Sequence, residues 1–268
     1  MNDATAAAGV QPPGTVLVTG GSRGIGAATC LLLGRRGHAV AVNYASDRAA
    51  ADRIVDEIRA AGGVALALQG DVAREADVMR LFEAIDRELP PLVGLVNNAG
   101  VIDQPCRVDA MDVARIERMF AINVVGSFVC AREAVRRMST RDAEQRWRAA
   151  GGARGGAIVN LSSAAAHLGG SGQYVDYAAA KGAIETFTIG LAKEVAAEGI
   201  RVNAVRPGII ETDIHASGGV PDRPRQMVPM IPMQRTGSAD EVAEAIVWLL
   251  SDAASYTTAA FLDVSGGR

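Results

Sequence analysis

The stretch TGGSRGIG at residues 19–26 decides the fold of this 268-residue chain. It follows the apolar run TVLV and precedes a segment whose apolar periodicity predicts a helix over residues 24–36. Glycines in such a turn let the backbone leave a strand sharply and approach a pyrophosphate, while the helix directs its amide groups and positive dipole end at the phosphates. The spacing is GxxxGxG, not the commoner GxGxxG, but its place between a strand and a helix predicts dinucleotide binding.

The rest of the chain repeats this alternation of strand and helix. Short apolar, β-branched runs predict strands at residues 15–19, 39–43, 64–69, 92–97, 157–161, 201–205 and 260–264. Longer periodic segments predict helices at residues 24–36, 47–61, 75–89, 111–138, 174–198 and 239–251. Strands that are apolar on both faces and alternate with helices are typical of a parallel sheet. We therefore predict one doubly wound (Rossmann) α/β domain at residues 14–268, with a seven-stranded parallel sheet, helices on both faces and a flexible tail at residues 1–13.

Composition and motif spacing exclude several classes of function. The net charge of −3 argues against nucleic-acid and anionic-membrane partners, whose binding domains are usually basic. The three cysteines and three histidines show neither a disulfide framework nor ligand spacing, so no metal site is predicted. The N-terminus lacks the pattern of a secretory signal and no apolar run reaches the length of a membrane span. We expect a cytoplasmic protein.

Two segments interrupt the alternation. Residues 139–156 are polar and rich in Arg and Gly, which predicts a helix end followed by a surface loop. Residues 207–232 hold five of the ten prolines, with Met227 and Met230 inside the segment and Met233 directly after it. Long segments of this kind inside a compact domain are usually functional, and methionines adapt to apolar ligands. We predict a substrate lid at about residues 207–236, with an ordinary surface excursion as the alternative.

The end of the second predicted strand bears on which dinucleotide binds. NAD usually needs an acidic residue there for the ribose 2′-hydroxyl, but this strand ends in AVNYAS, with Asn43 and Tyr44. Arg23, in the glycine-rich turn, could reach a 2′-phosphate. NADP(H) is therefore preferred, and NAD(H) stays possible. Asp47 could cap the next helix, and Arg48 is either a second phosphate ligand or simply exposed.

Only two of the 27 basic residues are lysines, Lys181 and Lys193. Tyr177 and Lys181 are four residues apart in a predicted helix and share one face. A nearby ammonium stabilises a phenolate, so it lowers a pKa that starts near 10 and makes tyrosine a usable acid or base. A chance surface pair is the alternative for these two residues alone. Lys193, beside Glu194, is interpreted as solvated surface.

Taken together, these motifs resemble the short-chain dehydrogenase/reductase family, of the roughly 250-residue type, over residues 14–267. The matching residues are TGGSRGIG at 19–26, Asp71, NNAG at 97–100, Asn123 in AINVVGSF, LSSAA at 161–165, Tyr177-x-x-x-Lys181 and RPGIIET at 206–212. Within the family the chain is most similar to glucose 1-dehydrogenase-like and 3-oxoacyl-carrier-protein-reductase-like members.

The resemblance implies four catalytic residues. Ser163 would hydrogen-bond the substrate carbonyl and the developing alkoxide, with Ser162 as its competitor for this role. Tyr177 would exchange the proton. Lys181 would bind the nicotinamide ribose and depress the Tyr177 pKa, and Asn123 would hold a water that links Lys181 to solvent.

The resemblance also implies the cofactor-binding residues. They are Gly20, Ser22, Arg23, Gly24, Ile25, Gly26, Asn43, Tyr44, Asp71, Val72, Asn97, Ala99, Gly100, Tyr177, Lys181, Pro207, Gly208, Ile210 and Thr212. Asp71 and Val72 would lie near the adenine, and residues 207–212 would flank the nicotinamide. The cofactor carries the hydride and the protein orients it.

The expected function is NADP(H)-dependent interconversion of a small-molecule carbonyl and a secondary alcohol. The alternatives are an NAD-dependent sugar or polyol dehydrogenase, a non-catalytic nucleotide-binding regulator, and a methyltransferase, which would not need the Tyr/Lys pair. The resemblance further implies a homotetramer that pairs helices 111–138 and 174–198. The sequence leaves the substrate itself open.

Overall fold

The computed structural model describes residues 14–141, 155–212, 214 and 218–268. The predicted tail at residues 1–13 and most of the predicted loop at 139–156 lie outside the described residues. Four residues of the predicted lid, at 213 and 215–217, do so as well.

Seven parallel strands form one sheet in the order β3-β2-β1-β4-β5-β6-β7. The strands are β1 (Thr15–Val18), β2 (Ala39–Tyr44), β3 (Ala65–Gln69), β4 (Leu92–Asn97), β5 (Gly156–Leu161), β6 (Ile200–Pro207) and β7 (Phe261–Val264). Every predicted strand is present, with ends shifted by at most two residues. The seven-stranded parallel sheet of the doubly wound domain is thus confirmed.

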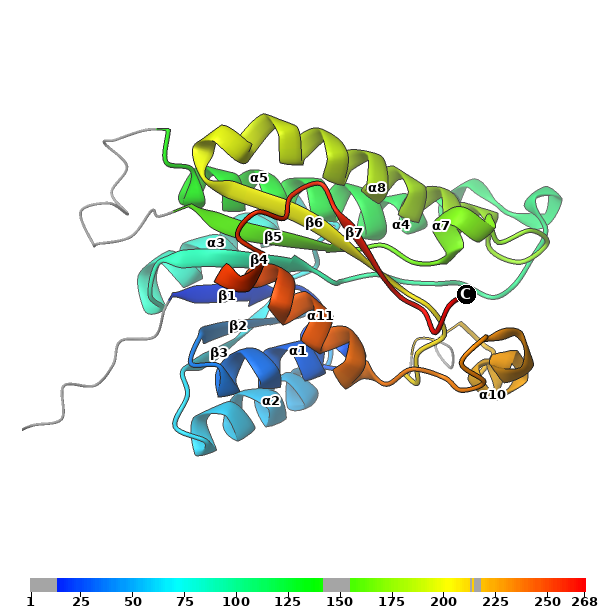
Figure 1. Ribbon diagram of the computed structural model, residues 1–268, viewed down its shortest axis with the longest axis horizontal. Coiled ribbons are helices and arrows are strands. Elements are labelled where there is room, and N and C mark those ends of the chain that lie inside the picture. The colour runs from blue at the N-terminus through cyan, green and yellow to red at the C-terminus, as the bar shows by residue number, and fades with distance from the viewer. Residues whose placement is uncertain (1–13, 142–154, 213, 215–217) are drawn as a thin grey trace, which may run out of the picture.

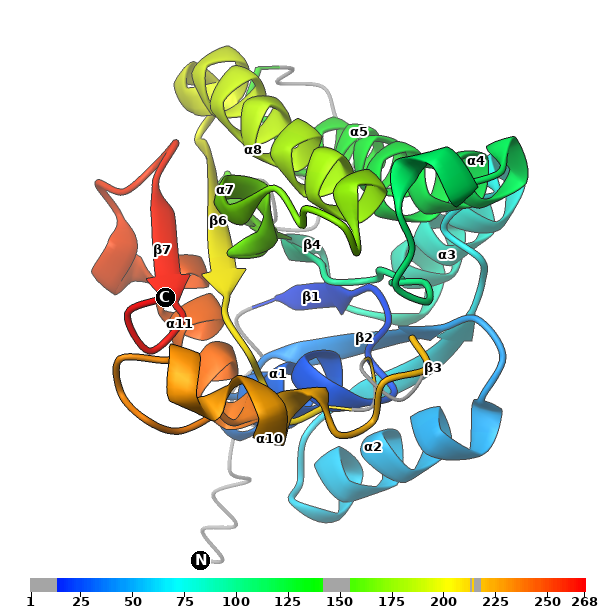
Figure 2. The same cartoon turned by 90° about the vertical axis from the view of Figure 1, so that its right-hand side faces the viewer.

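Helices cover both faces of the sheet (Figure 1). One face carries α1 (Gly24–Arg35), α2 (Arg48–Ala60) and α11 (Ala239–Leu250), and the other carries α3 (Glu75–Glu88), α5 (Gly126–Met138) and α8 (Val175–Val195). Three shorter helices, α4 (Val113–Phe120), α7 (Ala165–Leu168) and α10 (Arg223–Met227), lie towards the carboxyl ends of the strands (Figure 2).

Side chains of the central strands alternate between two buried clusters. Val16 and Val18 of β1 pack with α1, α2 and α11, whereas Leu17 between them packs with α3, α5 and α8. Because both faces of the sheet are covered, both sets of positions must be apolar. This explains why β1 and β2 show near-continuous apolar runs instead of a polar–apolar alternation.

The predicted helix at residues 111–138 is not continuous. It comprises α4, a π-helical turn at Ala121–Val125 and α5. Single π turns inside α-helices are rare and frequent at functional sites, and this one contains Asn123. The predicted helix at 174–198 is likewise shorter, because α8 ends at Val195 and passes into a 3₁₀ turn at Ala196–Glu198.

The apolar run AIVWLL predicts that Trp248 lies on a core face, and this prediction is wrong. The run AIVWLL in α11 places Trp248 among apolar neighbours in sequence, but its side chain is 43% exposed. The buried face of α11 is formed by Val242, Ile246 and Leu249, which recur at helical spacing, and Trp248 lies off that stripe. Among the described residues, no helix is both long and apolar enough to cross a membrane.

The sheet order reverses direction between β1 and β4. From β1 the chain continues outward through β2 and β3, and from β4 it continues outward on the other side. In open α/β sheets the crevice beyond the carboxyl ends of the strands at such a point is where ligands bind. Figure 2 looks onto this edge, where α7 and α10 border it.

Candidate active site

The glycine-rich turn follows β1 and leads into α1. Gly20 and Gly24 have φ angles of +62° and +52°, in the left-handed region that favours glycine. A Cβ on Gly26 would lie 2.3 Å from the carbonyl oxygen of Gly20, so α1 packs directly against the turn. Asn98 holds the same turn, because its amide nitrogen donates to the carbonyls of Thr19 (2.8 Å) and Gly20 (3.0 Å). The result is a rigid cradle at a helix N-terminus, which suits a pyrophosphate.

A cavity of about 270 Å³ opens beside this cradle. Most of the cofactor residues predicted from the N-terminal half of the chain line it: Gly20, Ser22, Arg23, Gly24, Ile25, Asn43, Tyr44, Asp71, Val72, Ala99 and Gly100. Thr212 closes it from the segment after β6. The turn and the strand ends therefore form one continuous wall, with room for the adenosine half of a dinucleotide.

Two predicted cofactor residues, Gly26 and Asn97, line neither this cavity nor the one beside it. Asn97 is 4% exposed, and its amide donates to the Asn160 side chain (2.9 Å) and the Ser127 carbonyl (3.2 Å). Its side chain therefore ties β4 to β5. Asn98, which the sequence analysis did not single out within NNAG, takes the place at the cavity wall.

Asn43 has a supporting position as well. It is 2% exposed, accepts from the Gly20 backbone N–H (3.2 Å) and donates to the Gly70 carbonyl (2.9 Å). Its side chain thus fixes the turn against the end of β3. Because both ends of the amide already form hydrogen bonds within the protein, Asn43 positions the cradle and is not expected to be a main ligand contact.

Three charged residues line this cavity, Arg23, Asp47 and Asp71, and Arg48 lies next to Asp47 in sequence. Asp47 caps α2 by accepting from the Ala50 N–H (2.9 Å), as one prediction had it. Arg48 pairs with Asp52 at 3.2 Å and does not line the cavity. Arg23 is exposed at the cavity wall, and among the described residues it has no ion-pair partner. Among the described residues that line this cavity, Arg23 is the one with a cationic side chain.

A second cavity of about 490 Å³ adjoins the first. The two share the wall residues Ile25, Asn98, Gly100, Thr212 and Ile214 and so form one groove. All four predicted catalytic residues, Asn123, Ser163, Tyr177 and Lys181, line this second cavity. So do Pro207, Gly208 and Ile210, predicted to lie beside the nicotinamide. The fold therefore brings these side chains, which are spread between positions 123 and 210 of the sequence, together in one cavity.

The two adjacent serines after β5 have different surroundings. Ser162 is 3% exposed and donates to the Glu185 carboxylate (2.8 Å), which is also held by Arg206. Ser163 instead lies beside the phenol of Tyr177 and lowers the pKa of that phenol. This arrangement favours Ser163 over Ser162 as the group that meets a substrate.

Tyr177 and Lys181 lie one turn apart on α8, with the Lys181 Nζ 5.6 Å from the centroid of the Tyr177 ring. Burial raises the pKa of Tyr177, and Ser163 only partly opposes this. This net direction is opposite to the depression expected from Lys181, because burial dominates. The Lys181 ammonium itself donates to the Leu161 carbonyl at 2.7 Å. Burial also lowers the pKa of Lys181 to about 8. The ammonium therefore stays mostly protonated at neutral pH.

The side chains of Asn123 and Lys181 both lie close to Gly100. A Cβ on Gly100 would lie 2.7 Å from the Asn123 Oδ1 and 3.6 Å from the Lys181 Nζ. The Asn123 side chain is held by hydrogen bonds from the Val101 N–H (3.2 Å) and to the Met119 carbonyl (3.0 Å). The π turn thus presents an amide to the buried ammonium, and only glycine leaves space between them.

The groove joins two kinds of chemistry. One end is a glycine cradle for phosphates, and the other holds a hydroxyl pair and a buried ammonium that can handle a proton beside a bound ligand. The residues present fit a nicotinamide dinucleotide, because side chains at Gly20, Gly24 or Gly100 would narrow the cradle that this ligand needs.

Known proteins match this chain over most of its length. The family model described as Enoyl-(Acyl carrier protein) reductase matches residues 20–268. An uncharacterised oxidoreductase of Escherichia coli, YgfF, is 54% identical over 94% of this chain and 98% of its own. A 3-oxoacyl-[acyl-carrier-protein] reductase of Synechocystis is 37% identical over 94% of this chain and 95% of its own.

Solved structures agree. A blue fluorescent protein from a metagenomic library, in complex with NADPH, superposes with a TM-score of 0.84 at 33% identity, covering 96% of this chain and 98% of its own. A short-chain dehydrogenase/reductase variant from Serratia marcescens has a TM-score of 0.85 at 30% identity, with the same coverage. The chain therefore belongs to the short-chain dehydrogenase/reductase family and is an NAD(P)-dependent oxidoreductase.

Proposed function

We propose that the protein interconverts a small-molecule carbonyl and a secondary alcohol, with NADP(H) as the preferred cofactor and Tyr177 as the general acid/base. The observation that carries this proposal is that Ser163, Tyr177 and Lys181 line the same cavity, next to the glycine cradle. A non-catalytic nucleotide-binding protein would need none of these three side chains.

In this proposal the chain's own residues handle the oxygen and its proton. A bound nicotinamide supplies the hydride in reduction. Ser163 donates a hydrogen bond to the substrate oxygen and stabilises the charge that develops on it. Tyr177 delivers the proton to that oxygen, and Lys181 holds the ribose and keeps a positive charge beside the phenol. Asn123 links Lys181 to solvent.

The raised pKa of Tyr177 bears on the direction of the reaction, carbonyl reduction or alcohol oxidation. Because burial raises the pKa of Tyr177, the phenol carries its proton at neutral pH. A protonated phenol is the form that donates to an alkoxide, so the free enzyme is prepared for carbonyl reduction. Oxidation of an alcohol would require the phenolate and is expected to be favoured at higher pH.

The test is a panel of ketones, aldehydes and oxoacyl thioesters, with one enoyl thioester, assayed by the absorbance of the reduced nicotinamide with NADPH and with NADH. We expect carbonyls to be reduced, and NADPH to give at least about tenfold higher kcat/KM than NADH, because one charged hydrogen bond contributes about 1.5–3 kcal/mol. Reduction of the enoyl thioester alone would contradict the carbonyl chemistry. A preference for NADPH below about threefold, equivalent to under about 1 kcal/mol, would overturn the cofactor assignment.

The cofactor preference is expected to depend on Arg23. In Arg23→Ser the kcat/KM with NADPH should fall by roughly tenfold or more, while the value with NADH should stay within about twofold, since only the 2′-phosphate contact is lost. Arg48→Ser is the matched control, because Arg48 pairs with Asp52 outside the cavity. Equal losses with both cofactors in Arg23→Ser would contradict a role in 2′-phosphate recognition.

We also propose that the segment at about residues 207–236 acts as a substrate lid. Its helix α10 and the following 3₁₀ turn at Val228–Met230 bring Met227 and Met230 to the larger cavity. Met230 is 62% exposed, so this wall is adaptable and loosely packed.

We further propose that the protein is a cytoplasmic homotetramer. Apolar side chains lie exposed on the helices expected to pair: Val113 (68%), Val125 (51%), Phe128 (46%) and Ile189 (38%). Exposed apolar groups on adjoining helices are typical of protein–protein contacts. Phe128 also stacks on Phe187, with ring centroids 3.7 Å apart, which joins α5 and α8 into one surface.

A further inference from the structure

The charged side chains lining the larger cavity are all cationic. Among its described wall residues are Lys181, Arg223 and Arg268, and no Asp or Glu; Arg268 also carries the α-carboxylate of the last residue. Lys181 already serves the catalytic end. The other two come from α10 and from the last residue of the chain, segments that both views of the molecule place close together (Figures 1 and 2).

Arg223 is held at this wall by neutral groups. Its guanidinium carbon lies 4.7 Å from the centroid of the Tyr174 ring, and its Nη1 donates to the Gln173 side chain at 2.9 Å. No carboxylate among the described residues forms an ion pair with it. A guanidinium oriented on an aromatic face, with donors left over, is preorganised for a planar anion.

Arg268 lies near enough to feel the charge of Arg223. Burial lowers the pKa of Arg268 first, and the positive charge of Arg223 lowers it further. No described Asp or Glu side chain lines the cavity beside these two guanidinium groups. A solvated pair of surface arginines would ordinarily turn outward, whereas these two line the same cavity as Ser163 and Tyr177.

The remaining wall and the spacing indicate what lies between the two ends. Tyr174, on which Arg223 stacks, precedes Tyr177 by three residues, about one helical turn. The wall around them is apolar, with Leu168, Ile209 and Met227. A ligand that reaches both ends would carry a carbonyl at one end, an anion at the other and a short apolar chain between them.

We propose that the substrate is such an oxo acid: its carbonyl meets Ser163 and Tyr177, and its carboxylate meets Arg223 and Arg268. This inference rests on the proposed function, since it names the substrate class of the same site. It predicts that charge at the far end of the substrate, more than chain length, controls affinity.

The experiment measures binding in a complex that cannot turn over. Calorimetry with the wild-type protein saturated with NADP⁺ would compare 3-oxobutanoate, 4-oxopentanoate and 5-oxohexanoate with their methyl esters. At least one acid should bind roughly 10- to 100-fold more tightly than its ester, because a charged hydrogen bond is lost in the ester. Esters that bind as tightly as all three acids would overturn the proposal.

Variants assign the effect to the two arginines. Arg223→Gln and Arg268→Gln should each weaken binding of the favoured acid by about tenfold or more and change ester binding by less than about twofold. Arg225→Gln is the matched control, because Arg225 lies exposed on the same helix and does not line the cavity. Equal effects of Arg223→Gln and Arg225→Gln would contradict the inference.

Turnover separates this inference from the proposed function. Selective binding of acids with no reduction of any carbonyl by NADPH or NADH would refute the proposed function and leave the anion site standing. Reduction of esters and acids with equal kcat/KM, together with equal affinities, would refute the anion site and leave the carbonyl chemistry standing.

Discussion

Tyr177→Phe is expected to abolish carbonyl turnover while NADPH still binds. The substitution removes only the phenolic oxygen, so the proton that the substrate oxygen needs must come from water. A positioned general acid contributes on the order of 10²–10⁴ in rate, and kcat should fall by about this factor. The cradle and the Arg23 wall are distant parts of the groove and remain intact. Fluorescence titration with NADPH and steady-state assays measure the two effects separately.

The control is Tyr256→Phe, which makes the same chemical change at a fully exposed tyrosine. Its kcat should equal that of the wild type within error. If Tyr177→Phe retained more than about a tenth of wild-type turnover, the proton would have to come from another group. Weakened NADPH binding at the same time would point to a cofactor contact as the main role of Tyr177.

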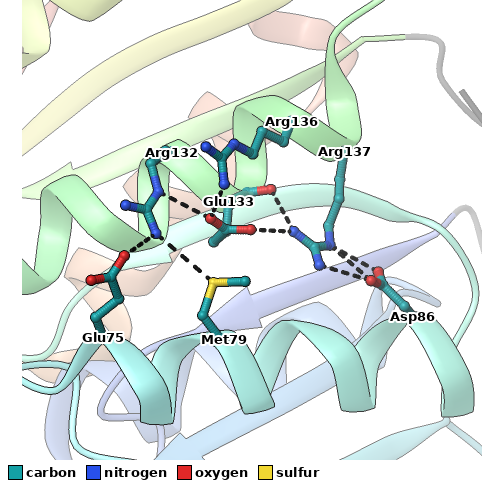
Figure 3. Close-up of polar contacts among 7 residues, drawn as sticks. All are labelled: Glu75, Met79, Asp86, Arg132, Glu133, Arg136 and Arg137. Carbon is teal, nitrogen blue, oxygen red and sulfur yellow. Dashed lines mark hydrogen bonds and ion pairs between the residues drawn. The ribbon is translucent and has the colours of Figure 1, made fainter.

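The second large effect concerns an ionic network between α3 and α5 (Figure 3). Arg137 is 8% exposed and donates to Asp86 of α3 (2.8 Å) and to Glu133 one turn back on α5 (2.9 Å). Glu133 is 2% exposed. Burial opposes its ionisation, but hydrogen bonds from Arg137 and Arg132 hold its pKa below the ordinary value. The network holds α5 against α3, and α5 is the helix that follows the π turn carrying Asn123.

Arg137→Ala should therefore be strongly destabilising. It leaves the buried Glu133 and the partly buried Asp86 without their shared cation, and breaking a buried ion pair in this way costs about 3–5 kcal/mol. In a chain of this size each kcal/mol lowers Tm by roughly 2–4 °C, so Tm should fall by roughly 6–20 °C. Differential scanning calorimetry of the purified protein measures this change.

Arg136→Ala is the matched control for this network. Arg136 also contacts Glu133, at 2.8 Å, but its side chain is 61% exposed. Exposed ion pairs contribute about 0–1 kcal/mol, so its Tm should change by a few degrees at most, roughly 0–4 °C. Similar Tm values for the two variants would show that the burial of Arg137 contributes little to stability.

Sequence patterns were sufficient for the framework of the fold. Apolar runs such as VLV at residues 16–18 reveal a strand covered on both faces, and the glycine-rich turn marks which strand comes first at the switch point. The four catalytic candidates also meet as expected in one cavity. Local chemistry determines each of these features, so a single sequence displays them.

Features that depend on neighbours distant in sequence were not predictable. The π turn at Ala121–Val125 disturbs the apolar period by one residue, which a 28-residue helical pattern conceals. Which asparagine of the NNAG motif faces the groove depends on whether β4 or the following turn holds it, and Asn97 is bound to Asn160 of β5. The raised pKa of Tyr177 depends on the burial of its phenol, which spacing does not show.

The recognition of an anion was equally hidden from the sequence. Arg223 and Arg268 are 45 residues apart and stand among many other arginines. Only the folded chain places them on the wall of the cavity that holds Tyr177.

Hydride transfer itself is the central claim, and isotope transfer tests it most directly. The protein would be incubated with a carbonyl substrate and NADPH carrying deuterium at both C4 positions, and the alcohol product analysed by mass spectrometry. The account predicts one deuterium in each product molecule, bonded to the former carbonyl carbon. An alcohol without deuterium at that carbon, or no alcohol from any carbonyl offered, would contradict it.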